Sequence, residues 1–565
     1  MSEVQVVRGE MQPWTDATTP HPALAAILAD TLPANRRTLI LGPHSPQLVE
    51  SVLAHSADVT ILLRSVTDAE QFANDFGPNL HVVTGALDGL QSNPYEVIVA
   101  ADGLDRVLGY DSADLSWSDR LAALTSLAAP DAVVVLGLEN EFSLLNLLDS
   151  RPADERHGDD EWRPLHDDPT RPVSIDQLKA ALPWPAEVYA DFGSRTFIHA
   201  DVAERARPGE LPTRLAVSAL EAVDTPLLSP AAEGVETASR AALLGSIPTG
   251  WLAVCGTQVQ HAIYAQTGPA VLTANQTPTG WSTTNRSDAG GSADSAERSA
   301  SAGGLLRFDP TVVPAEVPGG VSVETVLFRL AAAEDVPAFR KLAADLGEWV
   351  TASNVVLSWD DLILDGTSFA RGVSAWVTDV PVAKEDLLTA AWSRFHDRLI
   401  GQHRRHPWPP WLVGDDLISA WLGMSGVEPP EQIQATGPGA ESAAGEQVAY
   451  GKQLAGALAA VLETHDASVD VRSTLAAAEE AKRELFELKG HVYGLERTLG
   501  FRNKAMKTRE NRIRELRTQL QRLTVDHDRI RGSRTYAVSR VIFHAAQVRK
   551  PKTVARKLAR RIRKR

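Results

Sequence analysis

Cysteine is almost absent from this chain of 565 residues, in which Cys255 is the only one. A single thiol excludes a disulfide framework within the chain and a zinc site built from several cysteines. We interpret Cys255 as a small buried hydrophobic side chain. No other cluster of residues has the spacing of a metal site, so we predict none.

Long apolar runs are missing as well. No stretch approaches the roughly 20 consecutive apolar residues that a membrane-spanning helix needs. Residues 1–14 lack the basic segment and apolar core of a signal peptide. We therefore expect a cytoplasmic protein, and only its C-terminal tail is suited to a membrane surface.

Positive charge is scarce outside one end of the chain. The net charge is −16 and the pI is about 5.5, which argues against a general nucleic-acid binder. Residues 531–565 hold thirteen Lys or Arg and no Asp or Glu, so the rest of the chain carries −29, that is −16 minus 13. The hydrophobic content of 44% is enough for more than one buried core.

Short β-rich runs alternate with helical segments through the first two hundred or so residues. Strands are predicted at 38–41, 59–63, 80–83, 96–101 and 132–137, helices at 46–55, 68–76 and 116–128, and a closing antiparallel pair at 187–190 and 195–199. This alternation predicts an α/β fold with a parallel sheet over residues 35–205, after an N-terminal segment at 1–34.

Candidate binding residues follow the predicted strands. The first strand is followed by Gly42-Pro43-His44, the second ends at Arg64, the third is followed by Asp88, and the fourth is followed by Asp102. Open α/β sheets bind ligands at the carboxyl ends of their strands. No residue stands out as a catalytic base, so the sequence identifies no catalytic residue.

Three short motifs accompany this strand pattern, namely Leu62-Leu63-Arg64-Ser65, Asp102-Gly103-Leu104-Asp105-Arg106 and Leu115-Ser116-Trp117. With them, residues 35–205 resemble the class I methyltransferase-like proteins of actinobacteria, which use S-adenosylmethionine (SAM) and carry a long C-terminal coiled-coil extension. The resemblance implies a Rossmann-like methyltransferase sheet with SAM as cofactor. The cofactor-binding residues that it implies are Gly42, Pro43, His44, Arg64, Asp88 and Asp102.

Two positions depart from the pattern of such methyltransferases. Only Gly42 remains of the several glycines that usually form the first turn. Arg64 stands where an acidic residue normally accepts hydrogen bonds from the ribose hydroxyls, and a guanidinium has no acceptor to offer. Ser65 or Asp68 could substitute for the missing acid. The resemblance includes Leu62-Leu63-Arg64-Ser65, so it implies that the altered motif is a feature of the group and not a defect of this chain.

A second α+β domain is predicted at 206–430. It contains a Ser/Gly/Ala-rich flexible insertion at 277–304, helices at 321–350 and 384–403, and an extended run at 355–364. Parts of it, 354–356 and 374–376, faintly resemble a kinase-like lobe, but Val373 stands where the metal-binding aspartate is needed. We interpret the domain as a degenerate kinase-like module. A Gly/Pro/Ala-rich linker is predicted at 431–465.

The segment 466–531 has the clearest periodicity in the sequence. Apolar residues recur at alternating steps of three and four from Leu485 to Ile530, which predicts a coiled coil and a homo-oligomer. Extended back to Val471, the helix would be about 90 Å long at 1.5 Å per residue. Arg502 and Arg509 occupy seam positions, as does His527.

The tail at 532–565 is basic and amphipathic. Val554, Leu558 and Ile562 recur every four residues among Lys and Arg, as in a helix that lies on an anionic membrane surface. A solvated tail and a nucleic-acid-binding tail are the alternatives. The sequence at 532–536 also resembles tails of bacterial polysaccharide-assembly enzymes.

Two functional hypotheses follow. The first is a SAM-dependent methyltransferase-like transferase acting on a cell-envelope sugar or glycan. The second is a non-catalytic coiled-coil scaffold for polysaccharide assembly at the membrane surface.

Overall fold

The computed structural model describes residues 4–8, 15–16, 18, 21–109, 112–151, 168–223, 225–286, 304–409, 411–412, 414–427, 440–463 and 469–548. The chain divides into two compact units, Met1–Glu484 and Leu485–Arg565. The predicted amphipathic pattern at 554–562 lies outside the described residues, as does most of the predicted insertion at 277–304.

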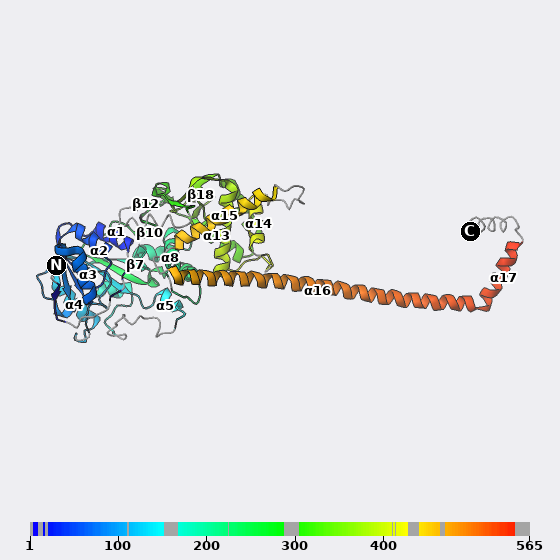
Figure 1. Ribbon diagram of the computed structural model, residues 1–565, viewed down its shortest axis with the longest axis horizontal. Helices are drawn as coiled ribbons and strands as arrows, with labels where there is room; N and C mark the ends of the chain where they lie inside the picture. The colour runs from blue at the N-terminus through cyan, green and yellow to red at the C-terminus, as the bar shows by residue number, and fades with distance from the viewer. Residues whose placement is uncertain are drawn as a thin grey trace. The chain divides into compact units, whose positions relative to one another are not determined.

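The first unit begins with a Rossmann-like sheet, which confirms the predicted α/β fold (Figure 1). Its parallel strands are β4 (His81–Thr84), β3 (Ser56–Leu63), β2 (Arg36–Leu41), β5 (Tyr95–Ala100) and β6 (Ala128–Glu139), in that spatial order. These strands are apolar on both faces because helices cover both sides. Helices α1 (Pro22–Thr31), α2 (Pro46–His55) and α3 (Val66–Phe76) share a core with one face, and α4 (Trp117–Leu127) packs on the other.

The sheet does not end near residue 205, where the sequence places the domain boundary. Strand β9 (Gly250–Cys255) lies between β6 and β7 (Ala186–Phe192) and is antiparallel to both. The predicted hairpin of β7 and β8 (Thr196–His199) forms, but β8 is followed by further antiparallel strands. These are β10 (Ile263–Thr267), β11 (Ala270–Thr277), β12 (Gly280–Arg286) and β14 (Glu316–Pro318).

The predicted start of the flexible insertion is wrong, because β12 pairs along its length with β11. A short strand, β1 (Gln5–Val6), extends the other edge of the sheet beside β4. Helices α5 (Leu144–Leu148), α6 (Ile175–Ala181), α7 (Ala200–Arg205), α8 (Leu211–Glu221) and α9 (Ala231–Arg240) complete this half of the first unit.

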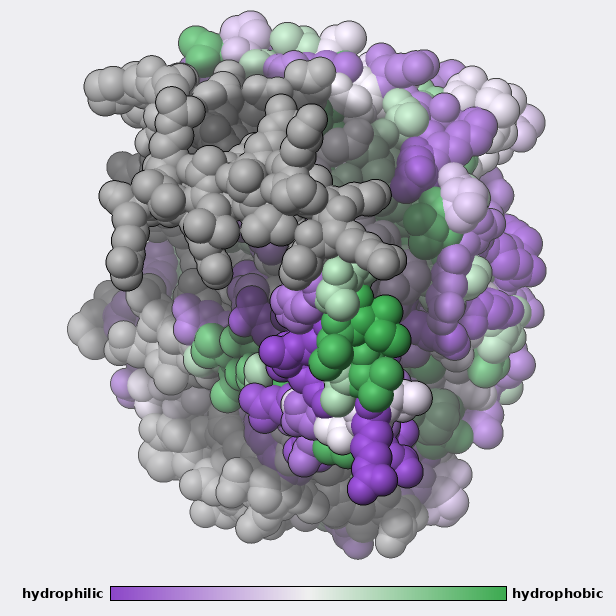
Figure 2. Space-filling model, turned by 90° about the vertical axis from the view of Figure 1, so that its right-hand side faces the viewer, coloured by the Kyte–Doolittle hydropathy of each residue, from purple (hydrophilic) through white to green (hydrophobic). Residues whose placement is uncertain are grey.

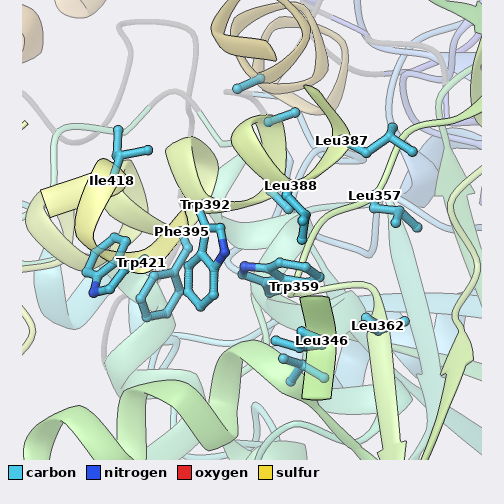
Figure 3. Packing of buried hydrophobic residues seen from close by; sticks show 14 of the residues in the cluster. Leu346, Leu357, Trp359, Leu362, Leu387, Leu388, Trp392, Phe395, Ile418 and Trp421 are labelled. Carbon is cyan, nitrogen blue, oxygen red and sulfur yellow. The ribbon is translucent and has the colours of Figure 1, made fainter. Parts of the chain in front are cut away.

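The second half of this unit has two small sheets. One is ordered β13 (Arg307–Phe308), β19 (Trp376–Val382), β16 (Ser353–Val355), and the other β15 (Val321–Ser322), β17 (Leu362–Asp365), β18 (Ser368–Arg371). Its helices are α11 (Val323–Ala332), α12 (Val336–Trp349), α13 (Lys384–Gly401) and α14 (Asp415–Met424). Their core is aromatic, with Trp392 packed against Trp359, Phe395 and Trp421 (Figure 3).

Two predictions in this half need correction. The single helix expected over 321–350 is two helices, because Glu334 between α11 and α12 has a positive φ of 60°. The extended run expected over 355–364 is strand only at its ends, in β16 and β17.

The predicted linker at 431–465 contains a helix, α15 (Ala440–Glu463). Its side chains Leu454, Leu458 and Val461 are buried in the same core as those of α13 and α14. These residues lie at helical spacing, so one apolar face packs although the surrounding sequence is rich in Gly and Ala. The linker prediction was therefore wrong for residues 440–463.

The predicted coiled-coil segment forms one helix, α16 (Val469–Gly532), followed by α17 (Arg534–Val548). The apolar seam side chains from Leu485 to Ile530 are 44–67% exposed. Figure 2 shows a hydrophobic patch bordered by hydrophilic residues on one face of the molecule. None of the described helices is both long enough and apolar enough to cross a membrane.

Candidate cofactor site

The turn after β2 places Gly42 beside the end of β5. Gly42 has a φ of +82°, a left-handed conformation that side chains rarely adopt. A Cβ atom built on it would lie 3.7 Å from Asp102 Oδ2. The structure therefore brings together two of the residues predicted to bind the cofactor.

The Asp102 carboxylate is paired within the chain. Arg106 Nε donates to Asp102 Oδ2 at 2.8 Å, and Arg106 Nη2 donates to the other oxygen. Burial raises the pKa of Asp102 to about 6, although the positive charge of Arg106 opposes this shift. Asp102 is thus a partly buried carboxylate, 18% exposed, held at the carboxyl edge of the sheet.

His44 is enclosed by protein and only 5% exposed, and Pro43 before it is also buried. The His44 Nδ1–H donates to the Gly42 carbonyl oxygen at 3.0 Å, and among the described residues Nε2 has no hydrogen-bond partner. Burial lowers the pKa of His44 to about 4. The imidazole is therefore neutral near pH 7.

Arg64 ends β3 and is neutralised by a residue from the N-terminal segment. Its Nε and Nη2 donate to the Asp16 carboxylate at 3.2 and 2.7 Å. The two side chains are 0% and 2% exposed. The Asp16 backbone N–H donates to Asp68 Oδ2 at 2.9 Å, which ties the same segment to α3. Asp16 therefore supplies a carboxylate at the strand end from which the sequence motif has lost it.

The N-terminal segment also lies against the end of β4. Val7 N–H donates to the Thr84 carbonyl at 2.9 Å, and the Ala86 N–H donates to the Arg8 carbonyl at 3.1 Å. A Cβ atom on Gly89 would lie 2.3 Å from the Arg8 carbonyl oxygen. The chain itself occupies the space beside this turn.

Asp88, the remaining predicted residue, lies on the short turn after β4 and accepts a hydrogen bond from Ser112 Oγ at 3.0 Å. Of the predicted residues, the structure thus brings Gly42, His44 and Asp102 together and pairs Arg64 elsewhere.

These residues do not fit SAM in this arrangement. The ribose hydroxyls need an acceptor at the end of β3, but Arg64 offers only donors. The Asp16 carboxylate could accept hydrogen bonds, but it is buried and already paired with the Arg64 guanidinium. The turn at Gly42 is the part of the site whose backbone conformation still suits SAM binding.

Sequence reasoning missed Asp16. It lies 48 residues before Arg64, and no local motif connects the two. The one signal was Arg64 itself, because an arginine at the end of a buried strand requires an anionic partner.

The kinase-like prediction places a metal-binding aspartate where Val373 stands. Instead, the nearby Asp361 accepts hydrogen bonds from the backbone N–H groups of Val373 and Ser374 at 2.9 and 2.8 Å. In the part of the chain that the structure describes, no group of three His, Cys, Asp or Glu side chains could hold a metal ion.

No family model and no curated protein matches this chain. Part of it is similar to a putative methyltransferase from Pseudomonas syringae, with 16% identity over 21% of this chain and 74% of that one, at a TM-score of 0.18. The CcbJ methyltransferase from Streptomyces caelestis gives 22% identity, coverage of 22% and 56%, and a TM-score of 0.19. A SAM-dependent methyltransferase from Clostridium acetobutylicum gives 11% identity, coverage of 24% and 56%, and a TM-score of 0.20.

These similarities cover about a fifth of the chain, and the fold assignment rests on the strand order of the sheet itself. The N-terminal part of the chain has a Rossmann-like fold.

Proposed function

We propose that the chain is a non-catalytic scaffold that retains a methyltransferase-like fold and serves polysaccharide assembly. The observation that supports a non-catalytic role is the buried pair of Arg64 and Asp16 at the position of the ribose-binding acid. A SAM molecule at that position would have to displace Asp16 and leave Arg64 buried without its counter-ion.

The size of that penalty argues against tight SAM binding. Removing one partner of a buried ion pair costs about 3–5 kcal/mol. At about 1.4 kcal/mol per tenfold change, even the lower figure weakens binding by roughly a hundredfold.

The second candidate is a SAM-dependent methyltransferase acting on a cell-envelope sugar or glycan. It is favoured by the left-handed Gly42 turn, which lies beside Asp102 at the carboxyl edge of the sheet. Under this alternative, residues 15–16 must leave Arg64 before the cofactor enters.

Calorimetric titration with SAM separates the two candidates. For the full chain we expect no saturable binding with a Kd below about 1 mM. The double variant Arg64→Asp/Asp16→Asn restores an acceptor at the end of β3 without burying two facing carboxylates, and should gain SAM binding. The matched control, Arg36→Asp at the exposed pair with Glu96, should not. Saturable binding by the unaltered chain, accompanied by methyl transfer to a glycan, would reject the scaffold proposal.

The scaffold proposal includes a homo-oligomer formed through α16 and attachment to an anionic membrane through the basic C-terminal end. Support for the first comes from the exposed heptad seam, and support for the second from the exposed apolar residues of α17, which precede a run of Lys and Arg.

A further inference from the structure

A cavity of about 140 Å³ lies between the antiparallel part of the large sheet and the helices of the second half of the first unit. Residues of β8, α8, the β10–β11 turn, α11 and α13 line it. None of the six residues predicted to bind the cofactor is among its lining residues. The cavity is therefore a separate candidate site.

Strand directions place this cavity at the ligand-binding edge of the sheet. Strands β7 and β6 are both antiparallel to β9, so they run in the same direction. Strand β10 is antiparallel to β8, which is antiparallel to β7, so β10 also shares this direction. Arg195 after β7 and Gln266 at the end of β10 therefore lie at the same edge as Gly42.

The cavity is nevertheless remote from the Gly42 turn. Five strand spacings separate β2 from β8 in the sheet, or about 24 Å at about 4.8 Å per spacing. A molecule bound in the cavity does not compete for the cofactor position.

A network of charged side chains forms the polar wall. Arg398 donates from Nε to Glu324 and from Nη1 to Glu221, both at 2.7 Å. Arg394 Nη2 donates to Asp360 Oδ2 at 3.1 Å. The Asp360 and Glu221 side chains both remain 25% exposed, so they keep carboxylate surface that can accept further hydrogen bonds.

The charges of the lining nearly cancel. The lining contains four arginines and five carboxylates, namely Arg195, Arg214, Arg394 and Arg398, with Glu221, Glu236, Glu324, Asp360 and Asp361. A polyphosphate or another polyanion needs a surplus of positive charge, which this wall does not offer. A neutral ligand that both donates and accepts hydrogen bonds suits it better.

An aromatic pair forms another part of the wall. The rings of Phe308 and Trp376 meet edge to face with centroids 5.3 Å apart, and both line the cavity. They pack on the β10–β11 turn, where a Cβ atom on Gly268 would lie 3.0 Å from Trp376. Aromatic side chains offer an apolar surface next to the polar groups, which together fix a ligand's orientation.

Two lining residues have buried polar atoms that lack a hydrogen-bond partner within the described part of the chain. Thr267 Oγ1 has no partner, and neither do Nε and Nη2 of Arg214. Enclosed polar atoms without partners cost about 1–3 kcal/mol each. Their presence beside the cavity indicates that the wall is suited to further polar contacts.

We propose that this cavity binds a single neutral sugar ring, whose hydroxyl groups pair with the carboxylates and arginines and whose apolar face packs on Phe308 and Trp376. This inference rests on the proposed scaffold function, to which it adds a ligand class. Its test uses neither SAM nor the oligomeric mass, so the two proposals can fail separately.

The test is saturation-transfer-difference NMR on the full chain with D-glucose, D-mannose and N-acetyl-D-glucosamine. We expect saturable transfer from at least one sugar. Gln266→Ala removes a side-chain amide that lines the cavity, and Phe308→Ala removes part of its aromatic wall. Each should raise the Kd of that sugar at least tenfold. The matched control is Gln276→Ala, an exposed glutamine on β11 outside the lining, which should leave the Kd unchanged.

Phe308 is partly buried, so a circular-dichroism spectrum checks that its variant folds, and Gln266→Ala tests the site independently. The proposal is overturned if no sugar gives saturable transfer, or if the control weakens binding as much as the cavity variants do. Binding of inorganic phosphate at the same residues in place of a sugar would also overturn it, because the ligand would then be an anion.

Discussion

At the residue scale, the Arg64–Asp16 pair joins the N-terminal segment to the end of β3 with both side chains almost fully buried. Arg64→Met should lower the free energy of unfolding by about 3–5 kcal/mol, because Asp16 is left buried without its partner. Urea denaturation of the full chain measures the change.

The double variant Arg64→Met/Asp16→Leu is the informative companion. Replacing both charges by apolar groups should recover most of the lost stability, since no charge is then left unpaired. Arg36→Met, at the exposed pair with Glu96, should change stability by less than about 1 kcal/mol. A double variant as unstable as the single one contradicts this account.

His44 gives the site a dependence on pH. Burial sets its pKa at about 4 in the folded chain against 6.5 for the ordinary value. The unfolded chain therefore binds more protons between these values, so the folded state loses stability as the pH falls from about 6.5 to about 4. His21 has the same shift and the same cause, and adds to the effect.

We expect the His44→Gln variant to lose less stability than the unaltered chain between pH 7.5 and pH 5, because glutamine does not titrate. Denaturation at the two pH values measures this difference. An equal loss in both proteins would show that His44 is not the buried neutral imidazole described above.

At the element scale, the parallel half of the sheet could be predicted because each strand is a short apolar run followed by a helix. The helix predicted at 46–55 matches α2 residue for residue. The position of β9 in the sheet could not be predicted in this way. It pairs with β6 and β7, which both precede it in the chain, and only the folded sheet shows that it lies between them. The Asp16 contact was missed for a related reason, since it too is non-local.

Helix α15 provides a test at this scale, because composition alone predicted a linker there. Leu454 is fully buried in the core of the second half of the first unit. Leu454→Ala should cost about 2–5 kcal/mol of unfolding free energy. Leu228→Ala, at an exposed leucine of the first unit, is the control, and should cost little in comparison. If Leu454→Ala is as mild as the control, residues 440–463 do not pack as a helix on this core.

At the scale of the whole molecule, the seam of α16 should determine the oligomeric state. Leu516 and Leu520 are exposed seam residues in an uninterrupted stretch of the heptad pattern. We expect analytical ultracentrifugation of the full chain to give a multiple of the 60.9 kDa chain mass. The double variant Leu516→Glu/Leu520→Glu should sediment as a monomer, because buried seam positions do not tolerate unpaired charges. A monomeric parent chain would reject the coiled-coil prediction.

The C-terminal end should bind the full chain to anionic lipid. Ile542 and Phe543 are exposed on α17, within a region that has no acidic residue after Arg531. Ile542→Asp/Phe543→Asp should reduce cosedimentation with phosphatidylserine vesicles several-fold, and added salt should weaken binding of the parent chain. The control Val380→Asp changes an exposed apolar residue of the first unit. Equal losses in the variant and the control would reject α17 as the contact.

The position of β9 has a consequence for synthesis of the chain. Strands β6 and β7 emerge from the ribosome first, but the strand that joins them ends only at Cys255. Until then both nascent strands have open edges, which are templates for pairing with other chains. A nascent chain stalled near residue 205 should therefore depend on chaperones and aggregate without them, whereas one stalled well beyond residue 255 should not.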